Sequence, residues 1–388
     1  MTNNSHPPRL IDQNRILYAD LLRVVAILGV VLIHCTGELT LSQGKIPYDH
    51  WWVGNVVYSS FKWSVPLFVI LSGMLILHDT KNLSPWQFLK KRFSKIVPPF
   101  IFWMIVYIIY NYRYNFSSFS NLTLKNPFFW IWDNIYRFFE LPWRENIFPT
   151  IITGDVYYHL WFIPMILGVY LLTPFFKVYL KSATQEDLNY FLLIWFLNGS
   201  IYTYCEQFFI VEHMSWMSYG GFFFFGYYIR KYTIPKERWL MWIGFICFIS
   251  TPFIVAYRCY LKGSYDDRAY VYLSPNIILG SFALVVWLIR FDWSRYVAKF
   301  PKFFNLMTKL STMSFAVYFI HALLIDLLKN GYLWGFYIYN NRLGPPDCAA
   351  CAIHPIFGAP IFFTVVALLS FLSVYLLRKL PKSAWYIG

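Results

Sequence analysis

Charged residues are scarce in this chain of 388 residues. Only 13% are Asp, Glu, Lys or Arg, about half of the roughly 25% that is typical of soluble globular proteins. Hydrophobic residues make up 58% of the chain and aromatic residues 22%, so the composition argues against a water-soluble enzyme. The net charge of +14 does not indicate nucleic-acid binding, because the lysines and arginines stand in short clusters between apolar runs.

The cysteines form no recognisable metal-binding motif, and the first residues lack the pattern of a cleavable signal peptide. The six cysteines lack the paired spacing of a zinc site, and we therefore expect no metal centre. Only Cys348 and Cys351 stand close together, where they form either a disulfide in the last outer loop or an incidental pair of thiols. The polar residues 1–13 do not resemble a cleavable signal peptide, so we expect the first apolar segment to be retained.

Apolar runs long enough to cross a bilayer recur along the chain, and a spanning helix needs about 20 such residues. The sequence predicts an all-α polytopic membrane bundle that forms one domain over residues 1–388. The span at 216–229 is the weakest, because it is short and contains three glycines. The ten expected spans are 16–36, 52–77, 96–112, 157–176, 188–204, 216–229, 239–257, 270–289, 311–328 and 357–377.

The distribution of positive charge predicts the orientation. An even number of spans puts both termini on one side, and 21 of the 33 lysines and arginines fall in segments on that side. Because positive residues are retained in the cytoplasm, we expect short cytoplasmic tails at 1–14 and 378–388. The long aromatic segment 113–156 is then extracytoplasmic, and it forms either an interfacial helix over a cavity or a belt of aromatic side chains at the headgroup level.

Three ionisable residues fall in the first span, and each such group costs about 2.5 to 3.5 kcal/mol on insertion into a membrane. Arg23 and His34 share one face of a helix and lie about 16 Å apart along its axis. Asp20 is too far from His34 to assist it but can pair with Arg23 at i+3. Glu38 can orient His34 if the helix continues through Gly37; the alternative is that His34 is an ordinary hydrogen-bonded histidine of a helix bundle.

Other candidates are weaker when taken singly. Lys62 lies at a membrane depth similar to that of His34, where it can bind negative charge or extend to the outer interface. The basic run at 90–95 can hold a polyphosphate, but such runs are also common topology signals that contact anionic lipids. Three further candidates are His159, Trp161 and His321.

Five segments in this order resemble the membrane-bound acyltransferase-3 family, and the resemblance covers nearly the whole chain. Residues 18–23 with His34 are similar to the family's first-helix pattern, in which an arginine and a histidine are functional. Residues 62–73 resemble its second-helix pattern, which ends in Ser-Gly. Residues 91–98 are similar to its basic run, although a lysine replaces the usual final arginine, and residues 159–163 and 318–321 match two more signatures.

The resemblance implies an O-acyltransferase of the cytoplasmic membrane that transfers an acyl group, expected to be acetyl from acetyl-CoA, to a hydroxyl of an outer surface glycan or lipid-linked glycan. Acetyl-CoA is then a co-substrate, and no permanently bound cofactor is expected. In this interpretation the CoA phosphates bind Lys91, Arg92 and Lys95, and Arg23 steadies the thioester end. His34 acts as general base or carries the acyl group, with Glu38 as its orienting carboxylate.

The acceptor side is expected to include Lys62, His159, Trp161 and His321. Two other functions remain open at this point. A transporter or flippase explains polar residues along a membrane path, although the chain has no repeated halves. A membrane glycosyltransferase needs acidic residues near the first outer loop, where Glu38 and Asp49 stand.

Overall fold

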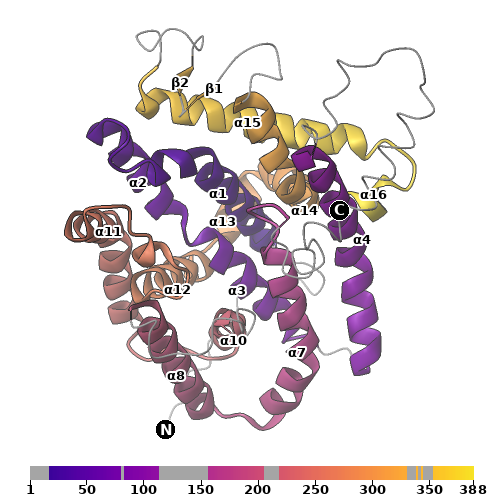
Figure 1. The fold of residues 1–388 in the computed structure, drawn as a ribbon. Coiled ribbons are helices and arrows are strands. Elements are labelled where there is room, and N and C mark those ends of the chain that lie inside the picture. The colour runs from indigo at the N-terminus through magenta and orange to yellow at the C-terminus, as the bar shows by residue number, and fades with distance from the viewer. Residues whose placement is uncertain are drawn as a thin grey trace. The chain divides into compact units, whose positions relative to one another are not determined.

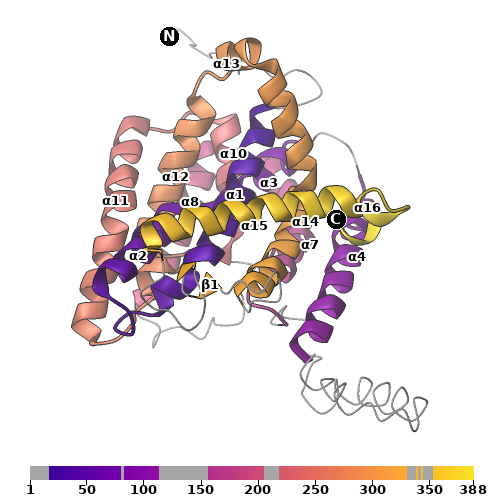
Figure 2. The same cartoon turned by 90° about the horizontal axis from the view of Figure 1, so that it is seen from above.

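The computed structural model describes residues 17–79, 83–112, 156–204, 218–329, 338–339, 342–343 and 353–388. These residues are almost entirely helical (Figures 1 and 2), which confirms the predicted all-α class. The two short strands β1 (Ile338–Tyr339) and β2 (Arg342–Leu343) pair in antiparallel register. The expected outer segment 113–156, apart from Val156, and the pair Cys348 and Cys351 lie outside the described residues.

The helical elements are α1 (Leu17–Leu41), α2 (Tyr48–Phe61), α3 (Ser64–Ile76), α4 (Pro85–Tyr112), α7 (Phe162–Ser182), α8 (Gln185–Tyr204), α10 (Gly220–Lys231), α11 (Glu237–Lys262), η3 (Arg268–Tyr270), α12 (Pro275–Arg290), α13 (Ser294–Lys299), α14 (Pro301–Lys329), α15 (Pro355–Leu377) and α16 (Ser383–Tyr386). Among the described residues, eight segments are long and apolar enough to cross a membrane, which makes this a polytopic membrane bundle. Ten spans were expected. The expected spans 188–204 and 216–229 correspond to α8 and α10, which are not among the eight, and the 12 residues of α10 reach only about 18 Å.

The chain divides into two compact units. Unit 1 comprises Met1–Thr80, Leu180–Met214 and Ser218–Tyr375, and unit 2 comprises Lys81–Tyr179, Ser215–Met217 and Leu376–Gly388. In unit 1, α1 packs against α2, α3 and α14, while α11 packs against α12 (Figures 1 and 2). In unit 2, α16 packs against α4, and the indole N–H of Trp103 donates to the Ile387 carbonyl at 3.2 Å.

The second expected span is broken in the middle. It forms α2 and α3, which are separated by Lys62 and Trp63. Pro66 lies in the first turn of α3 and has no backbone N–H, so it cannot donate to the Lys62 carbonyl as a helix would require. Lys62 therefore lies at a helix break that is buried inside unit 1.

Glycines allow α3 and α10 to pack closely. A Cβ atom on Gly73 would lie 1.9 Å from the Phe223 carbonyl oxygen, and one on Gly226 would lie 2.0 Å from the Ile70 carbonyl oxygen. Only hydrogen fits at these positions, so the backbones of the two helices are in contact. Gly226, one of the three glycines that made 216–229 a weak candidate for a span, is therefore a packing residue of a helix in which every residue from Gly220 to Ile229 is buried.

Candidate active site

Polar side chains of α1 and α14 face each other at three levels within unit 1. The pairs are Asp20 with Thr308 and Ser311, His34 with His321, and Glu38 with Lys329. Residue numbers rise together on both helices, so α1 and α14 run parallel. We call these seven residues together with Arg23 the polar row.

The first level of the polar row is centred on the Asp20 carboxylate, which is only 3% exposed. Arg23 donates to Asp20 Oδ1 at 3.1 Å, which is the i+3 pair that the sequence predicts. Across the helix interface, Ser311 Oγ donates to Oδ1 at 2.9 Å and Thr308 Oγ1 donates to Oδ2 at 3.2 Å. These hydrogen bonds stabilise the buried charge and join the two helices.

The second level brings two imidazoles together. The rings of His34 and His321 have centroids 5.3 Å apart, with 36° between their planes. His321 is fully buried, and its Nδ1 lies 3.2 Å from the Val317 carbonyl oxygen. A neutral His321 with its proton on Nδ1 donates that bond, and its Nε2 is then the nitrogen that carries a lone pair. As a whole residue, His34 is partly buried, whereas His321 is fully buried.

Lys62 adds a positive charge near His34. Its side chain interacts electrostatically with His34 and is only 7% exposed, although it belongs to the broken α2–α3 segment. Nζ donates to the Tyr58 hydroxyl at 3.3 Å and lies 4.6 Å from the centroid of the Tyr58 ring and 4.3 Å from that of Tyr272. This enclosure by two aromatic rings differs from the alternative in which Lys62 extends to the membrane interface.

The third level is an ion pair between Glu38 and Lys329. Helix α1 continues without interruption through Gly37 to Leu41, as the expected role for Glu38 requires. The partner that the structure gives Glu38 is a lysine from α14, and Lys329 also interacts electrostatically with His34. Glu38 and Lys329 therefore form a charged end of the polar row, and the ion pair shown for Glu38 is with Lys329 rather than with His34.

This arrangement has the parts that acyl transfer requires. An imidazole can accept the proton of an attacking hydroxyl or attack a thioester itself. A buried ammonium group can stabilise the negative charge that develops on a carbonyl oxygen. His34 and Lys62 provide these two groups within one unit, and His321 provides a second imidazole beside the first.

The expected phosphate-binding residues lie in unit 2, on the first turns of α4. Lys91 and Lys95 are exposed and, being four residues apart, share one face of the helix. Arg92 is partly buried, with its guanidinium 5.6 Å from the centroid of the Phe88 ring and 6.0 Å from that of Tyr170 on α7. The two lysines therefore present charge to the surroundings, while Arg92 packs on aromatic rings.

His159 and Trp161 also belong to unit 2, in the turn that leads into α7. His159 is 2% exposed, and its ring meets those of Tyr107 and Tyr157 edge-on, with centroids 5.2 and 5.7 Å apart. Trp161 is partly buried. These two candidates therefore lie among aromatic side chains of their own unit.

Sequence reasoning found the α1 side of the polar row but missed most of what faces it. Thr308, Ser311 and Lys329 were not predicted, and neither were the tyrosines around Lys62. Ser311 and Lys329 are 18 residues apart, or about five full turns of α14, and this shared face was a usable signal, because polar residues on one face of an apolar helix indicate a buried polar contact. Nothing in the sequence identifies Tyr272, which comes from the turn just before α12, as a neighbour of Lys62.

The comparisons with known proteins point to one enzyme class. A family model described as an acyltransferase domain, that of acyltransferase-3, matches residues 16–379. The match spans both units and confirms the resemblance that the five segments indicate. No curated protein and no solved structure matches the chain.

Proposed function

The chain belongs to the acyltransferase-3 family, and we propose that it transfers an acetyl group from cytoplasmic acetyl-CoA to a hydroxyl of a surface glycan or lipid-linked glycan at the cytoplasmic membrane. The observation that carries the proposal is the grouping of His34, His321 and Lys62 inside a membrane bundle. A transporter would explain polar residues in the membrane, but not their occurrence in an acyltransferase domain that spans residues 16–379.

His34 has one of two roles in the proposed reaction. As a general base, it takes the proton of the acceptor hydroxyl while the oxygen attacks the thioester carbonyl, and the proton then passes to the departing CoA thiolate. As a carrier, its nitrogen attacks the thioester first, and the hydroxyl then displaces the imidazole from the acyl group. Both routes yield an ester and free CoA, and both need a substrate to reach the His34 ring.

Lys62 and Arg23 supply positive charge in this proposal. Lys62 stabilises the oxyanion of the tetrahedral intermediate, because a preorganised cation in a dry site needs little reorganisation during the reaction. Arg23 steadies the thioester end of the donor. Its side chain is 36% exposed even while it pairs with Asp20, so its guanidinium can also contact a ligand.

The donor phosphates bind to α4 in this proposal. Lys91 and Lys95 project from one exposed face and can contact the CoA phosphates together. Arg92 contributes at their side, and its packing on Phe88 and Tyr170 restricts its motion. His159, Trp161 and His321 are assigned to the acceptor, as the resemblance implies.

The test separates donor binding from transfer. The full chain in nanodiscs is incubated with radiolabelled acetyl-CoA and cell-envelope glycolipid, and donor affinity and label transfer are measured on the same samples. We expect His34→Gln to lower transfer at least about 100-fold while leaving donor affinity unchanged, since a general base contributes this much or more. The double variant Lys91→Gln/Lys95→Gln should weaken donor binding at least about tenfold, because each charged contact is worth about 1.5 to 3 kcal/mol.

Two variants serve as matched controls. His78→Gln removes a histidine of unit 1 that contacts the Tyr227 carbonyl, and Lys181→Gln removes an exposed lysine near the end of α7. Both should retain donor binding and transfer. Normal transfer by folded His34→Gln would refute the role of His34, and movement of unmodified glycolipid without acetylation would refute the enzyme itself.

A further inference from the structure

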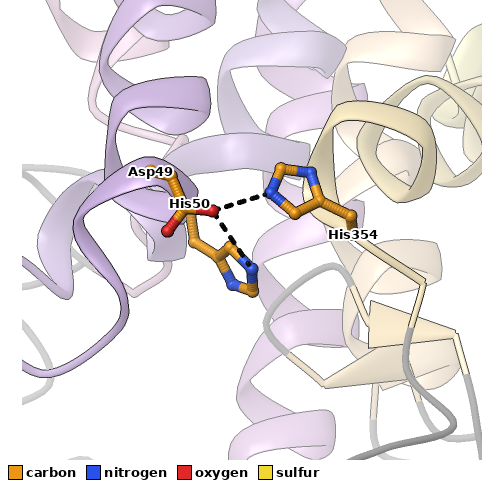
Figure 3. Close-up of side chains that lie close together, drawn as sticks. All are labelled: Asp49, His50 and His354. Atoms are coloured by element: carbon orange, nitrogen blue, oxygen red, sulfur yellow. Dashed lines mark hydrogen bonds and ion pairs between the residues drawn. The ribbon is translucent and has the colours of Figure 1, made fainter.

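Three ligand-type side chains meet at the end of unit 1 where α2 and α15 begin. They are Asp49 and His50 on the first turn of α2 and His354 immediately before α15 (Figure 3). The Asp49 carboxylate lies between the two imidazoles, with Oδ2 3.0 Å from His354 Nε2 and 3.9 Å from His50 Nε2. The histidine rings approach edge-on, with centroids 4.6 Å apart.

The donor atoms of these three residues all lie within 4.8 Å of one another. Two ligands that each bind a tetrahedral Zn²⁺ at about 2.0 to 2.1 Å are about 3.4 Å apart. The observed separations bracket that value, so side-chain shifts of no more than about 1.5 Å would close the site. We propose that Asp49, His50 and His354 form a Zn²⁺ site that links the start of α2 to the start of α15.

The donor set selects the ion. Imidazole nitrogens bind zinc and its transition-metal neighbours, whereas Mg²⁺ and Ca²⁺ prefer oxygen ligands. Two neutral histidines and one carboxylate leave a single positive charge on the zinc complex, and the Asp49 side chain is 66% exposed, so water can fill the fourth position. No spacing motif in the sequence predicts the site, because its ligands come from positions 49, 50 and 354.

Metal binding changes one local hydrogen bond. The Ile356 N–H points to His354 Nδ1 at 3.2 Å, so in the metal-free protein the proton of His354 is on Nε2 and is donated to Asp49. Zn²⁺ binds the lone pair of Nε2, which is free only in the other tautomer, so the single proton of the neutral ring moves from Nε2 to Nδ1 when the metal binds. The Ile356 N–H loses its acceptor, but it lies in an exposed first helical turn where water can replace the imidazole.

Such a site would fix α15 to the end of unit 1 that also carries the ion pair between Glu38 and Lys329. Helix α1 ends there, and residues 42–47 connect it directly to α2. The site is separate from the polar row and does not depend on the reaction proposed above.

The experiment measures zinc binding directly. The full chain with a histidine-free affinity tag is purified into nanodiscs, stripped with a chelator, and titrated with Zn²⁺ in competition with a chromophoric zinc indicator. We expect one equivalent to bind, and at least about tenfold weaker binding for His50→Gln and for His354→Gln. Asp49→Asn is a third variant that still accepts the hydrogen bond from His354 but offers a poor metal ligand, so it should fold and bind weakly. His78→Gln is the matched control and should bind normally.

A second measurement uses stability. Zn²⁺ should raise the melting temperature of the wild type but not that of the His50→Gln/His354→Gln double variant, because a ligand stabilises only the state that binds it. An excess of Mg²⁺ should not displace the zinc. The proposal is overturned if the wild type does not compete with the indicator, if the double variant keeps the bound equivalent, or if Mg²⁺ displaces it.

Discussion

The contact between α3 and α10 predicts a large difference between two glycine-to-alanine substitutions on the same helix. At Gly226 an added Cβ would lie 2.0 Å from the Ile70 carbonyl oxygen and 2.7 Å from the Met74 amide nitrogen. Ordinary contacts begin near 3.4 Å, so the two backbones must separate by about 1.4 Å. At Gly220, in the first turn of α10, an added Cβ would meet nothing within 4 Å.

The magnitude follows from two opposing effects. Overpacking a dense interior costs about 1 to 3 kcal/mol, and the upper end applies here because backbone atoms cannot rotate away. Alanine regains up to about 1 kcal/mol of helix propensity. Gly226→Ala should therefore lower the free energy of unfolding by about 2 kcal/mol. Gly220→Ala, which gains propensity without overpacking, should leave it unchanged or raise it by up to about 1 kcal/mol.

Unfolding by SDS, followed through tryptophan fluorescence in mixed micelles, measures both variants against the wild type. If Gly226→Ala is as stable as Gly220→Ala, then the backbones of α3 and α10 are not in contact at Ile70, and the account of α10 as a buried packing helix is wrong.

Two further predictions concern titratable groups. Asp20→Ala removes the acceptor of three hydrogen bonds and should destabilise the protein by about 2 to 5 kcal/mol in the same SDS assay. Asp20→Asn should destabilise it less. A loss of stability below about 1 kcal/mol for Asp20→Ala would contradict the hydrogen bonds at the first level of the polar row. His78 lies just beyond α3, and its pKa is lowered to about 4, mainly by burial. The hydrogen bond to the Tyr227 carbonyl raises this pKa, and the nearby charges of Arg230 and Lys231 lower it further. The unfolded chain then binds more protons than the folded protein between about pH 6.5 and 4, so the contribution of His78 to stability is complete above this window and is lost as the pH falls through it. The melting temperature should therefore decrease less between pH 7.5 and pH 4.5 for His78→Gln than for the wild type. Equal decreases would contradict the burial of this ring.

The sequence was most informative about local relations. Helical periodicity placed Arg23 and His34 on one face, and the i+3 spacing of Asp20 and Arg23 predicted their ion pair, because both relations depend only on helix geometry. The apolar runs predicted the class of fold. Eight of the ten expected spans coincide with candidate spans of the described residues, while 188–204 and 216–229 correspond to α8 and to the short buried helix α10.

Relations across the fold were not predictable in the same way. Thr308 and Ser311 are ordinary polar residues in the sequence, and they gain a role only because α14 packs parallel to α1. The proposed zinc ligands show the same limit, because Asp49 and His354 meet although they are 305 positions apart in the sequence. The assignment of the CoA phosphates to Lys91, Arg92 and Lys95 stays a prediction, as does the cytoplasmic position of both termini.

The first and third levels of the polar row determine where His34 and His321 meet. Along the axis of α1, His34 lies about 21 Å beyond Asp20, and along the axis of α14, His321 lies about 20 Å beyond Thr308. Because the two helices are parallel and are joined at the first level, the two imidazoles lie at the same height along the helix pair. A slip of one residue on α14 would turn His321 by 100° about the helix axis and move it away from His34. The ion pair between Glu38 and Lys329 opposes that slip from the other end. The hydrogen bonds of Asp20, about 21 Å from His34 along α1, therefore position the histidine pair without any contact to it.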